Sequence, residues 1–222
     1  MALALSSTIS FTKIDYYAGG TVTTGSVSLP ANSLIVIVAG NSTAVDDYFY
    51  AGTPTNTGTA LTWNVVSGSQ NDDGTNYQSL GFFWAKNTSA QTVTITSNFD
   101  GLGTFPVLSA ISGYVFTGHN TTTPIGAIGG GQTGTITTTA SGSYVVSGII
   151  DTGASNYTSS NMTYQTIANT AADAFAAYAS RPATGSFTAS YASGPFVAPA
   201  YEIIEILAAG GDAKLSVGML TL

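Results

Sequence analysis

The sequence contains no cysteine and few charged residues. Each of these shortages excludes certain kinds of binding site or partner. Without cysteine, neither a disulfide framework nor a thiolate metal site can form. Charged residues make up 7% of the chain, against about 25% in ordinary soluble domains. The net charge is -7, and the basic residues are Lys13, Lys86, Arg181 and Lys214. Because binding to a phosphate backbone requires clustered Lys and Arg, we expect no nucleic-acid partner.

Long apolar runs are also missing. The longest, residues 34–39, is far shorter than the ~20 residues that a membrane-spanning helix needs. Residues 1–6 have neither the basic region nor the long apolar region of a secretory signal. We therefore expect a soluble protein that is made in a cytoplasm, is not exported by the usual route and has no membrane partner.

The sequence does contain repeated alternation of apolar and polar residues, which is the pattern of a half-buried strand. Turns rich in Gly, Pro, Asn and Asp separate these segments. Strands are predicted at residues 3–11, 25–29, 33–39, 61–66, 79–85, 92–96, 108–116, 134–138, 144–150, 163–167, 174–179, 186–191 and 201–207. The alanine-rich stretch 168–179 could form a helix, but its parallel in the other half of the chain favours a strand. The predicted fold is an all-β, antiparallel, jelly-roll-like β-sandwich.

The two halves of the chain resemble each other. The matching segments are 25–40 with 134–148, 80–87 with 174–181, and 108–116 with 199–207. We therefore predict two half-sheets that bury their apolar faces against each other, about 10 Å apart. The predicted layout is an N-terminal strand or arm (1–19), a sandwich (20–209) with halves at about 20–118 and 128–209, and a C-terminal strand or arm (210–222).

Both ends of the chain carry alternating segments that need a neighbouring strand. In the C-terminal segment, Leu215, Val217 and Met219 alternate with polar or small residues. Such a strand pairs either within its own sheet, which we favour for both ends, or with a neighbouring subunit by β-augmentation. The candidate interface residues are Leu3, Leu5, Ile9, Phe11, Tyr48, Tyr50, Leu215, Val217 and Met219.

The titratable residues do not form a recognisable catalytic pattern. His119 is the only histidine, and no Gly-x-Ser-x-Gly turn accompanies it, so we interpret it as a solvated loop residue. Glu202 and Glu205 are the only glutamates. Since residues three apart on a strand face opposite sides, these two cannot flank one glycosidic bond. We interpret both as structural carboxylates and expect no enzyme and no catalytic residues.

The acidic loop at residues 71–76 is the candidate metal site. Asp72 and Asp73 could supply oxygen ligands to calcium, but the run lacks the EF-hand pattern and its closing glutamate. An ordinary solvated turn is therefore favoured. The glycine run 129–131 lacks the following lysine of a phosphate loop and is interpreted as a flexible turn. No cofactor is predicted.

The consecutive aromatic residues Phe82, Phe83 and Trp84 fall on a predicted strand. Neighbouring strand residues face opposite sides, so Phe83 should enter a different core from Phe82 and Trp84. We expect the aromatic residues to fill cores first and contact interfaces second. Sugar binding through stacked rings is a third use.

One group of motifs resembles a known type of module. The first half contains a strand, the turn Leu29-Pro-Ala-Asn-Ser-Leu34, an apolar strand, a Trp-containing strand and then Thr92-Val-Thr-Ile-Thr96. This order resembles the jelly-roll-type sandwich modules of tailed-phage virion proteins and bacterial secreted proteins, over residues 22–208. As a chain without a signal sequence or enzyme domain, it is similar to phage capsid decoration (cement) proteins, which brace neighbouring capsomers.

This resemblance implies a structural virion protein, assembled in the host cytoplasm, that decorates and stabilises a viral capsid through protein–protein contacts. The implied partners are the major capsid protein or other virion proteins, and further copies in a homo-oligomer such as a trimer. The alternative is a carbohydrate-binding or adhesion module of a phage tail or an extracellular surface protein. That module would use exposed aromatic residues, for which the candidates are Tyr48, Tyr50, Trp63 and Tyr77.

Overall fold

The computed structural model describes ten segments of the chain. These are residues 2–15, 20–43, 51–66, 71–72, 78–99, 106–130, 134–151, 157–168, 173–192 and 200–210. This part is all-β, all its strand pairs are antiparallel, and it contains no helix long and apolar enough to cross a membrane. The β-sandwich class predicted from the alternation is therefore confirmed.

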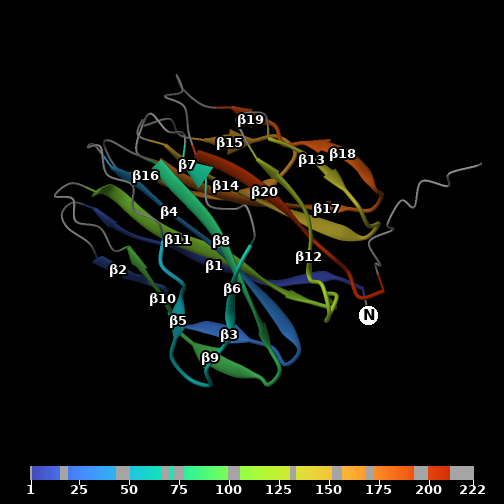
Figure 1. Ribbon diagram of the computed structural model, residues 1–222, viewed down its shortest axis with the longest axis horizontal. Helices are drawn as coiled ribbons and strands as arrows, with labels where there is room; N and C mark the ends of the chain where they lie inside the picture. Colours follow the sequence, from blue (N-terminus) through green and yellow to red (C-terminus); the bar gives the residue numbers. More distant parts are fainter. Residues whose placement is uncertain are drawn as a thin grey trace, which may run out of the picture.

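The strands fall into two sets that follow one another along the chain (Figure 1). The N-terminal half contains β1 (Ala4–Asp15), β2 (Gly20–Thr23), β3 (Val27–Leu29), β4 (Ser33–Thr43), β5 (Thr55–Asn56), β6 (Trp63–Val65), β7 (Asn71–Asp72), β8 (Gln78–Asn87), β9 (Gln91–Val93), β10 (Ile95–Phe99) and β11 (Pro106–Thr117). The C-terminal half contains β12 (Ile125–Gly130), β13 (Thr135–Thr138), β14 (Ser143–Asp151), β15 (Thr158–Ser159), β16 (Thr163–Ala168), β17 (Asp173–Arg181), β18 (Gly185–Thr188), β19 (Tyr191–Ala192) and β20 (Ala200–Ile206).

Each half has one main sheet and a thinner outer layer. The N-terminal main sheet has the order β1-β11-β4-β8-β6, with β7 also paired to β8, and its outer layer is formed by β2-β10-β5 and β3-β9. The C-terminal main sheet has the order β12-β20-β14-β17-β16, and its outer layer is formed by β13-β18 and β15-β19. The main sheets match strand for strand, so the two halves share one topology.

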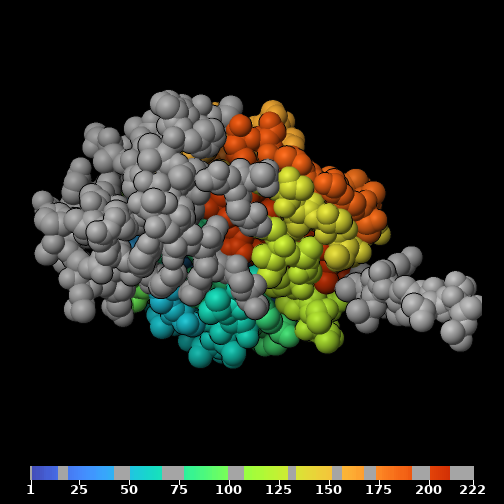
Figure 2. All heavy atoms as spheres, turned by 45° about the horizontal axis from the view of Figure 1, so that its top comes forward, coloured from blue at the N-terminus to red at the C-terminus, as the bar shows by residue number. Residues whose placement is uncertain are grey.

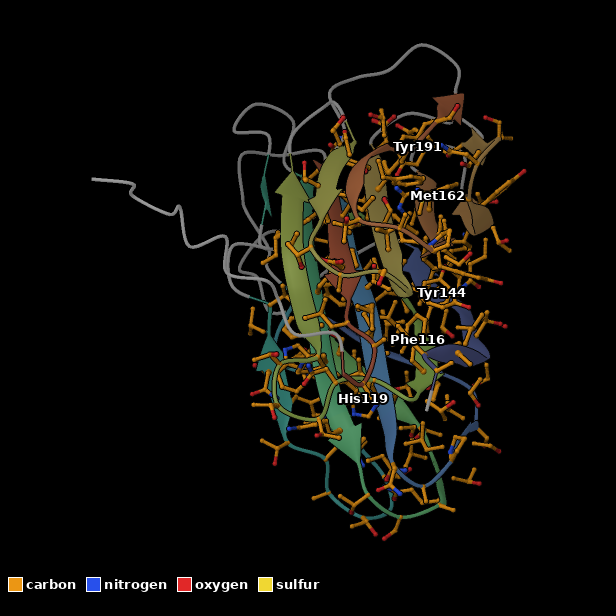
Figure 3. All side chains as sticks on the ribbon, turned by 90° about the vertical axis from the view of Figure 1, so that its right-hand side faces the viewer. Phe116, His119, Tyr144, Met162 and Tyr191 are labelled. Atoms are coloured by element: carbon orange, nitrogen blue, oxygen red, sulfur yellow. The ribbon has the colours of Figure 1, made fainter. Side chains whose placement is uncertain are left out.

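Three apolar cores separate these four layers. The central core lies between the two main sheets, where Phe116 and Tyr144 bring one ring from each sheet to 5.4 Å between centroids (Figure 3). The N-terminal and C-terminal cores lie between each main sheet and its own outer layer. The predicted burial of one half against the other is therefore present, but each half is itself a sandwich. The short strands of the outer layers supply the two additional layers.

The main sheets face each other in reversed order. β1 contacts β16, β11 contacts β17, β4 contacts β14, and β8 contacts β20. A two-fold axis through the central core would generate this arrangement. The connection from β11 to β12 joins the halves at the surface, where its yellow-green residues lie between the cyan and green N-terminal half and the orange C-terminal half (Figure 2).

The central strands β4 and β14 explain why their segments are continuously apolar. Each lies between two cores, so both of its faces are covered, and alternation is replaced by runs of buried Ile, Val and Leu. The turns before them are also repeated. Asn32 and Gly142 both have positive φ, at 55° and 70°, and the hydroxyls of Ser33 and Ser143 donate to the carbonyls of Pro30 and Ala140.

The alignment between the halves needs one correction. Phe116 pairs with Leu34 and Ile206 pairs with Tyr144, so Phe116 corresponds to Ile206 and not, as the segment alignment predicts, to Leu207. A one-residue slip of this kind moves every side chain to the opposite face. The N-terminal segment, expected as a strand or an arm, contains the strand β1, which pairs with β11 in the N-terminal main sheet. The strand predicted from Ala174 is confirmed as β17.

Candidate functional site

His119 lies in the connection between the halves and is buried, which corrects its interpretation as a solvated residue. Its backbone forms a β-bridge with Ala208, near the described end of the chain (Figure 3). In the part of the chain that the structure describes, Nδ1 has no hydrogen-bond partner. Burial, followed by the nearby Lys86 charge, lowers the pKa of His119, so the ring is neutral at pH 7. His119 is therefore a residue packed at the junction of the two halves.

Glu202 is a buried carboxyl on the face of β20 that also carries Ile204 and Ile206, and this face enters the central core. It pairs with Gly148 on one side and Gly130 on the other, and both neighbours lack a side chain. Neither carboxyl oxygen has a hydrogen-bond partner among the described residues. Burial raises the pKa of Glu202 from 4.5 to about 9, so this group holds its proton at neutral pH.

Glu205 lies on the opposite face of the same strand, and its carboxylate, unlike that of Glu202, is surrounded by hydrogen-bond donors. Its carboxylate accepts the backbone N–H groups of Ala127, Thr139 and Ala140 and the hydroxyl of Thr139. Burial alone would raise the pKa of Glu205, but these donors outweigh it and lower the pKa below its ordinary value. Glu202 and Glu205 thus face opposite sides of β20, as the three-residue spacing predicts. The ionised side chain ties β12 to the β13–β14 turn.

A chain of hydroxyl groups fills part of the C-terminal core. Ser147 Oγ and Tyr191 OH are hydrogen-bonded at 2.6 Å, and Tyr191 OH donates to Tyr201 OH at 3.0 Å. Tyr191 OH also approaches Met162 Sδ at 3.8 Å (Figure 3). Burial raises the pKa of both tyrosines. Because the hydroxyls have partners inside the core, they stabilise its packing.

The structure describes only part of the acidic loop (71–76) and of the glycine run (129–131). The backbone of Asp72 lies in the short strand β7 and pairs with β8, while Asp73 lies outside the described residues. Within the described residues, no three His, Asp or Glu side chains gather closely enough to hold a metal ion. Gly129 and Gly130 are strand residues of β12, which corrects their interpretation as a turn.

The three consecutive aromatic residues of β8 divide between cores as predicted. Phe82 enters the central core and Trp84 packs against it, while Phe83 enters the N-terminal core. Trp63, a candidate for sugar stacking, packs against the N-terminal core and donates from Nε1 to Asn56 Oδ1 at 3.4 Å. Tyr48, Tyr50 and Tyr77 lie outside the described residues.

The interface candidates at the N-terminus take part in the protein's own cores. Leu3 is buried in the central core, and Leu5 and Phe11 are partly buried against it. Ile9 is buried in the N-terminal core. β1 thus pairs within its own sheet, the alternative favoured from the sequence. The C-terminal candidates, Leu215, Val217 and Met219, lie outside the described residues.

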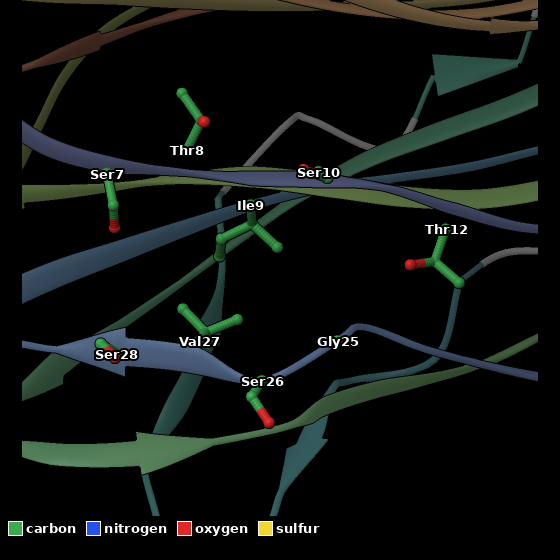
Figure 4. Close-up of a pocket in the computed structure, with 9 residues that line it drawn as sticks. All are labelled: Ser7, Thr8, Ile9, Ser10, Thr12, Gly25, Ser26, Val27 and Ser28. Atoms are coloured by element: carbon green, nitrogen blue, oxygen red, sulfur yellow. The ribbon is translucent and has the colours of Figure 1, made fainter.

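A groove not predicted from the sequence runs along the open side of the N-terminal sandwich, between β1 and β3. It has a volume of ≈ 270 Å³, and Figure 4 shows Ile9 of β1 and Val27 of β3 facing each other across it. Its other lining residues are Ser7, Thr8, Ser10, Thr12, Gly25, Ser26 and Ser28. The Ser7 hydroxyl points from β1 toward β3 and is shielded from solvent, and no described residue forms a hydrogen bond with it.

The fold and these sites define a duplicated, four-layer, all-β sandwich protein with apolar cores and one polar-rimmed groove. No family model, no curated protein and no solved structure matches the chain.

Proposed function

We propose that the protein is a structural virion component that decorates and stabilises a viral capsid through protein–protein contacts. Its partners in this role are the major capsid protein or other virion proteins, together with further copies of itself. Support comes from the position of the exposed apolar residues. The large apolar side chains exposed on the described surface are Val65, Ile128 and Tyr164, and each lies on the outermost strand of a main sheet.

Outermost strands with exposed apolar side chains are suited to pairing and burial at joints between subunits. Buried apolar area contributes about 25 cal/mol per Å² before the entropic cost of association. Repetition over many equivalent sites on a shell multiplies a modest contribution. The low charge of the chain suits such contacts, because they depend little on ionic strength.

Co-sedimentation with capsids tests this proposal. Purified protein is mixed with shells of the candidate virus that lack it, and the mixture is separated on a density gradient. We expect the protein to migrate with the shells and to raise the temperature at which they open. Val65→Ser and Ile128→Ser should weaken binding, while Thr62→Ser, an exposed polar change next to β6, serves as the matched control. Protein that stays at the top of the gradient contradicts the proposal.

Tyr164 favours carbohydrate binding as the second candidate function. Its ring is 41% exposed and stacks on the buried Phe175 at 5.4 Å with an interplanar angle of 21°. Thr166, two residues along the same strand and on the same face, is exposed. A rigidly held ring beside a hydroxyl group is suited to stacking against a sugar face.

A polysaccharide pull-down and a glycan array separate this function from the first. Carbohydrate binding requires retention that Tyr164→Ala abolishes and Tyr164→Phe preserves, because phenylalanine keeps the stacked ring. The control is Thr163→Ala, an exposed residue on the opposite face of β16. Loss of retention in this control alone, or absence of retention for the unchanged protein, would exclude Tyr164 as the binding residue.

A further inference from the structure

The connection between the halves is bonded to the segment that follows β20. Asn120 donates its backbone N–H to the carbonyl of Leu207, and Ala209 donates its N–H to the carbonyl of Gly118, both at 2.8 Å. These two bonds lie on either side of the β-bridge that His119 forms. The backbone of His119 is therefore held against the end of the C-terminal half from both directions.

We call the two bonded segments, residues 118–124 and 207–209, the junction clamp. The clamp also contacts the N-terminal half at two points. Its first residue packs closely against the carbonyl of Ala2, and Lys86 of β8 donates from Nζ to the carbonyl of Thr121 at 2.9 Å. The clamp thus joins the start of the chain, one main sheet and the end of the other.

The His119 ring lies inside this clamp in a site that disfavours a positive charge. His119 is 5% exposed, and the Lys86 ammonium is the charged group that acts on it. The described residues bonded to the connection, 2–3 and 207–209, and the connection itself contain no titratable side chain besides His119. Burial and the neighbouring ammonium both oppose the imidazolium form, so they hold the pKa of His119 below its ordinary 6.5.

Opening of the clamp would return the ring to water and restore its ordinary proton affinity. Between pH 6.5 and the lower pKa of the closed state, the open form binds a proton that the closed form does not. The closed clamp therefore loses stability relative to the open one as the pH falls through this range.

We propose that the junction clamp is an acid-sensitive latch, in which protonation of His119 releases residues 118–124 from residues 207–209 while the main sheets stay folded. Because the connection also packs against the backbone of Ala2 and Leu3, opening loosens the start of the chain. Leu3 is a buried residue of the central core, so acid gives access to one end of that core. The latch is a property of the chain itself and stands apart from the proposed virion role.

The two buried carboxyls of β20 cannot produce this behaviour. The pKa of about 9 at Glu202 makes the whole protein more stable as the pH falls toward 4.5, which is the opposite sign. Glu205, with its lowered pKa, keeps its stabilising charge until the pH falls below the ordinary pKa of a glutamate. A loss of protection that is confined to the clamp above about pH 5 therefore comes from His119.

Native-state hydrogen exchange of the full-length protein tests the latch. Protection factors of the Asn120 and Ala209 amides are measured at about pH 8 and about pH 5, the range over which histidine changes its charge. We expect both to fall by at least about threefold at the lower pH, while the amides of β4 keep or gain protection. His119→Gln, which cannot take up a proton, should show no such fall. Unchanged protection of both amides in the natural protein, or equal falls in the two proteins, would overturn the proposal.

Titration of the His119 ring signal by NMR gives a second measurement that requires no substitution at this residue. The signal is unambiguous because the chain has one histidine. We expect a midpoint below pH 6.5, and Lys86→Gln should raise it toward 6.5 by removing the neighbouring charge. The matched control Lys13→Gln removes an equal charge from β1 and should leave the midpoint unchanged. A midpoint at or above 6.5 in the natural protein, or equal effects of the two lysine variants, also overturns the proposal.

Discussion

The side-chain amide of Gln165 in β16 donates a hydrogen bond to the hydroxyl of Ser112 in β11, with 2.6 Å between nitrogen and oxygen. The same amide lies 3.1 Å from the carbonyl oxygen of Ile9 in β1, to which it also donates. One side chain of the C-terminal half thus contacts two strands of the N-terminal half. This polar contact lies beside the central core and fixes the two main sheets relative to each other.

Replacing Gln165 should therefore destabilise the whole protein. Gln165→Ala is expected to lower the free energy of unfolding by about 1–3 kcal/mol, because the Ser112 hydroxyl oxygen and the Ile9 carbonyl each lose the Gln165 donor, and Ile9 keeps only the side-chain bond from Ser112. Chemical denaturation measures the change, and Thr166→Ala, at the exposed neighbouring position, is the control. Equal stability of the two variants would show that the contact does not hold the halves together.

The buried carboxyl of Glu202 should make stability fall as the pH rises from about 4.5 to about 9. Its folded-state pKa of about 9 lies above the ordinary 4.5, so the folded protein keeps a proton that the unfolded chain loses. The free energy of unfolding should fall by about 1.4 kcal/mol for each pH unit between these two values. Glu202→Gln keeps the shape without the titration, so it should flatten this slope and raise stability at pH 7. An unchanged pH profile in the variant would contradict the assignment.

Glu205 should have the opposite effect on the pH dependence of the free energy of unfolding. Its lowered pKa means that its contribution is present above the ordinary pKa of a glutamate and is lost as the pH falls through the folded-state value. Glu205→Gln should lower the free energy of unfolding by about 2–4 kcal/mol at pH 7, since the charged acceptor of several hydrogen bonds is removed. The difference from the unchanged protein should shrink on acidification. A difference that grows toward acid pH would refute this account.

Gly148 of β14 lies against β4 and β8 of the other main sheet. A Cβ atom there would lie 2.6 Å from Val38 Cγ1 and 3.2 Å from Leu80 Cδ2. Gly148→Ala should therefore cost about 1–3 kcal/mol by overpacking the central core. Thermal unfolding provides the measurement, and Val38→Ala in the same chain should recover part of the loss. Gly25→Ala, which has open space around it, is the control for the substitution itself.

The strands were predictable because their signal is local. Alternation over a few residues and the turn at Pro30–Ser33 depend on neighbouring residues only, and both appear in the structure where the sequence places them. The sequence alignment of β11 with β20, in contrast, was wrong by one residue, because Phe116 corresponds to Ile206 and not to Leu207. The buried Glu202 and Glu205 interrupt the apolar pattern of β20, so alternation alone does not define its faces.

The burial of His119 and the groove beside β1 carry no local signal. His119 is buried because its backbone pairs with Ala208, which is distant in the sequence. The groove exists because β1 and β3 belong to different layers that remain apart, whereas β12 and β13 come together. A sequence comparison of the two halves shows that they are similar. It does not show that β1 and β3 lie farther apart than β12 and β13.

The sequence by itself determined the all-β class, the positions of the main strands and the relation between the halves, since side-chain alternation and turn chemistry act over short distances. Only the tertiary structure decided the four layers, the opposite protonation of Glu202 and Glu205, and the open edge at β1. Each of these depends on which sheet face a residue meets across the molecule, and that is set by packing between segments far apart in the chain.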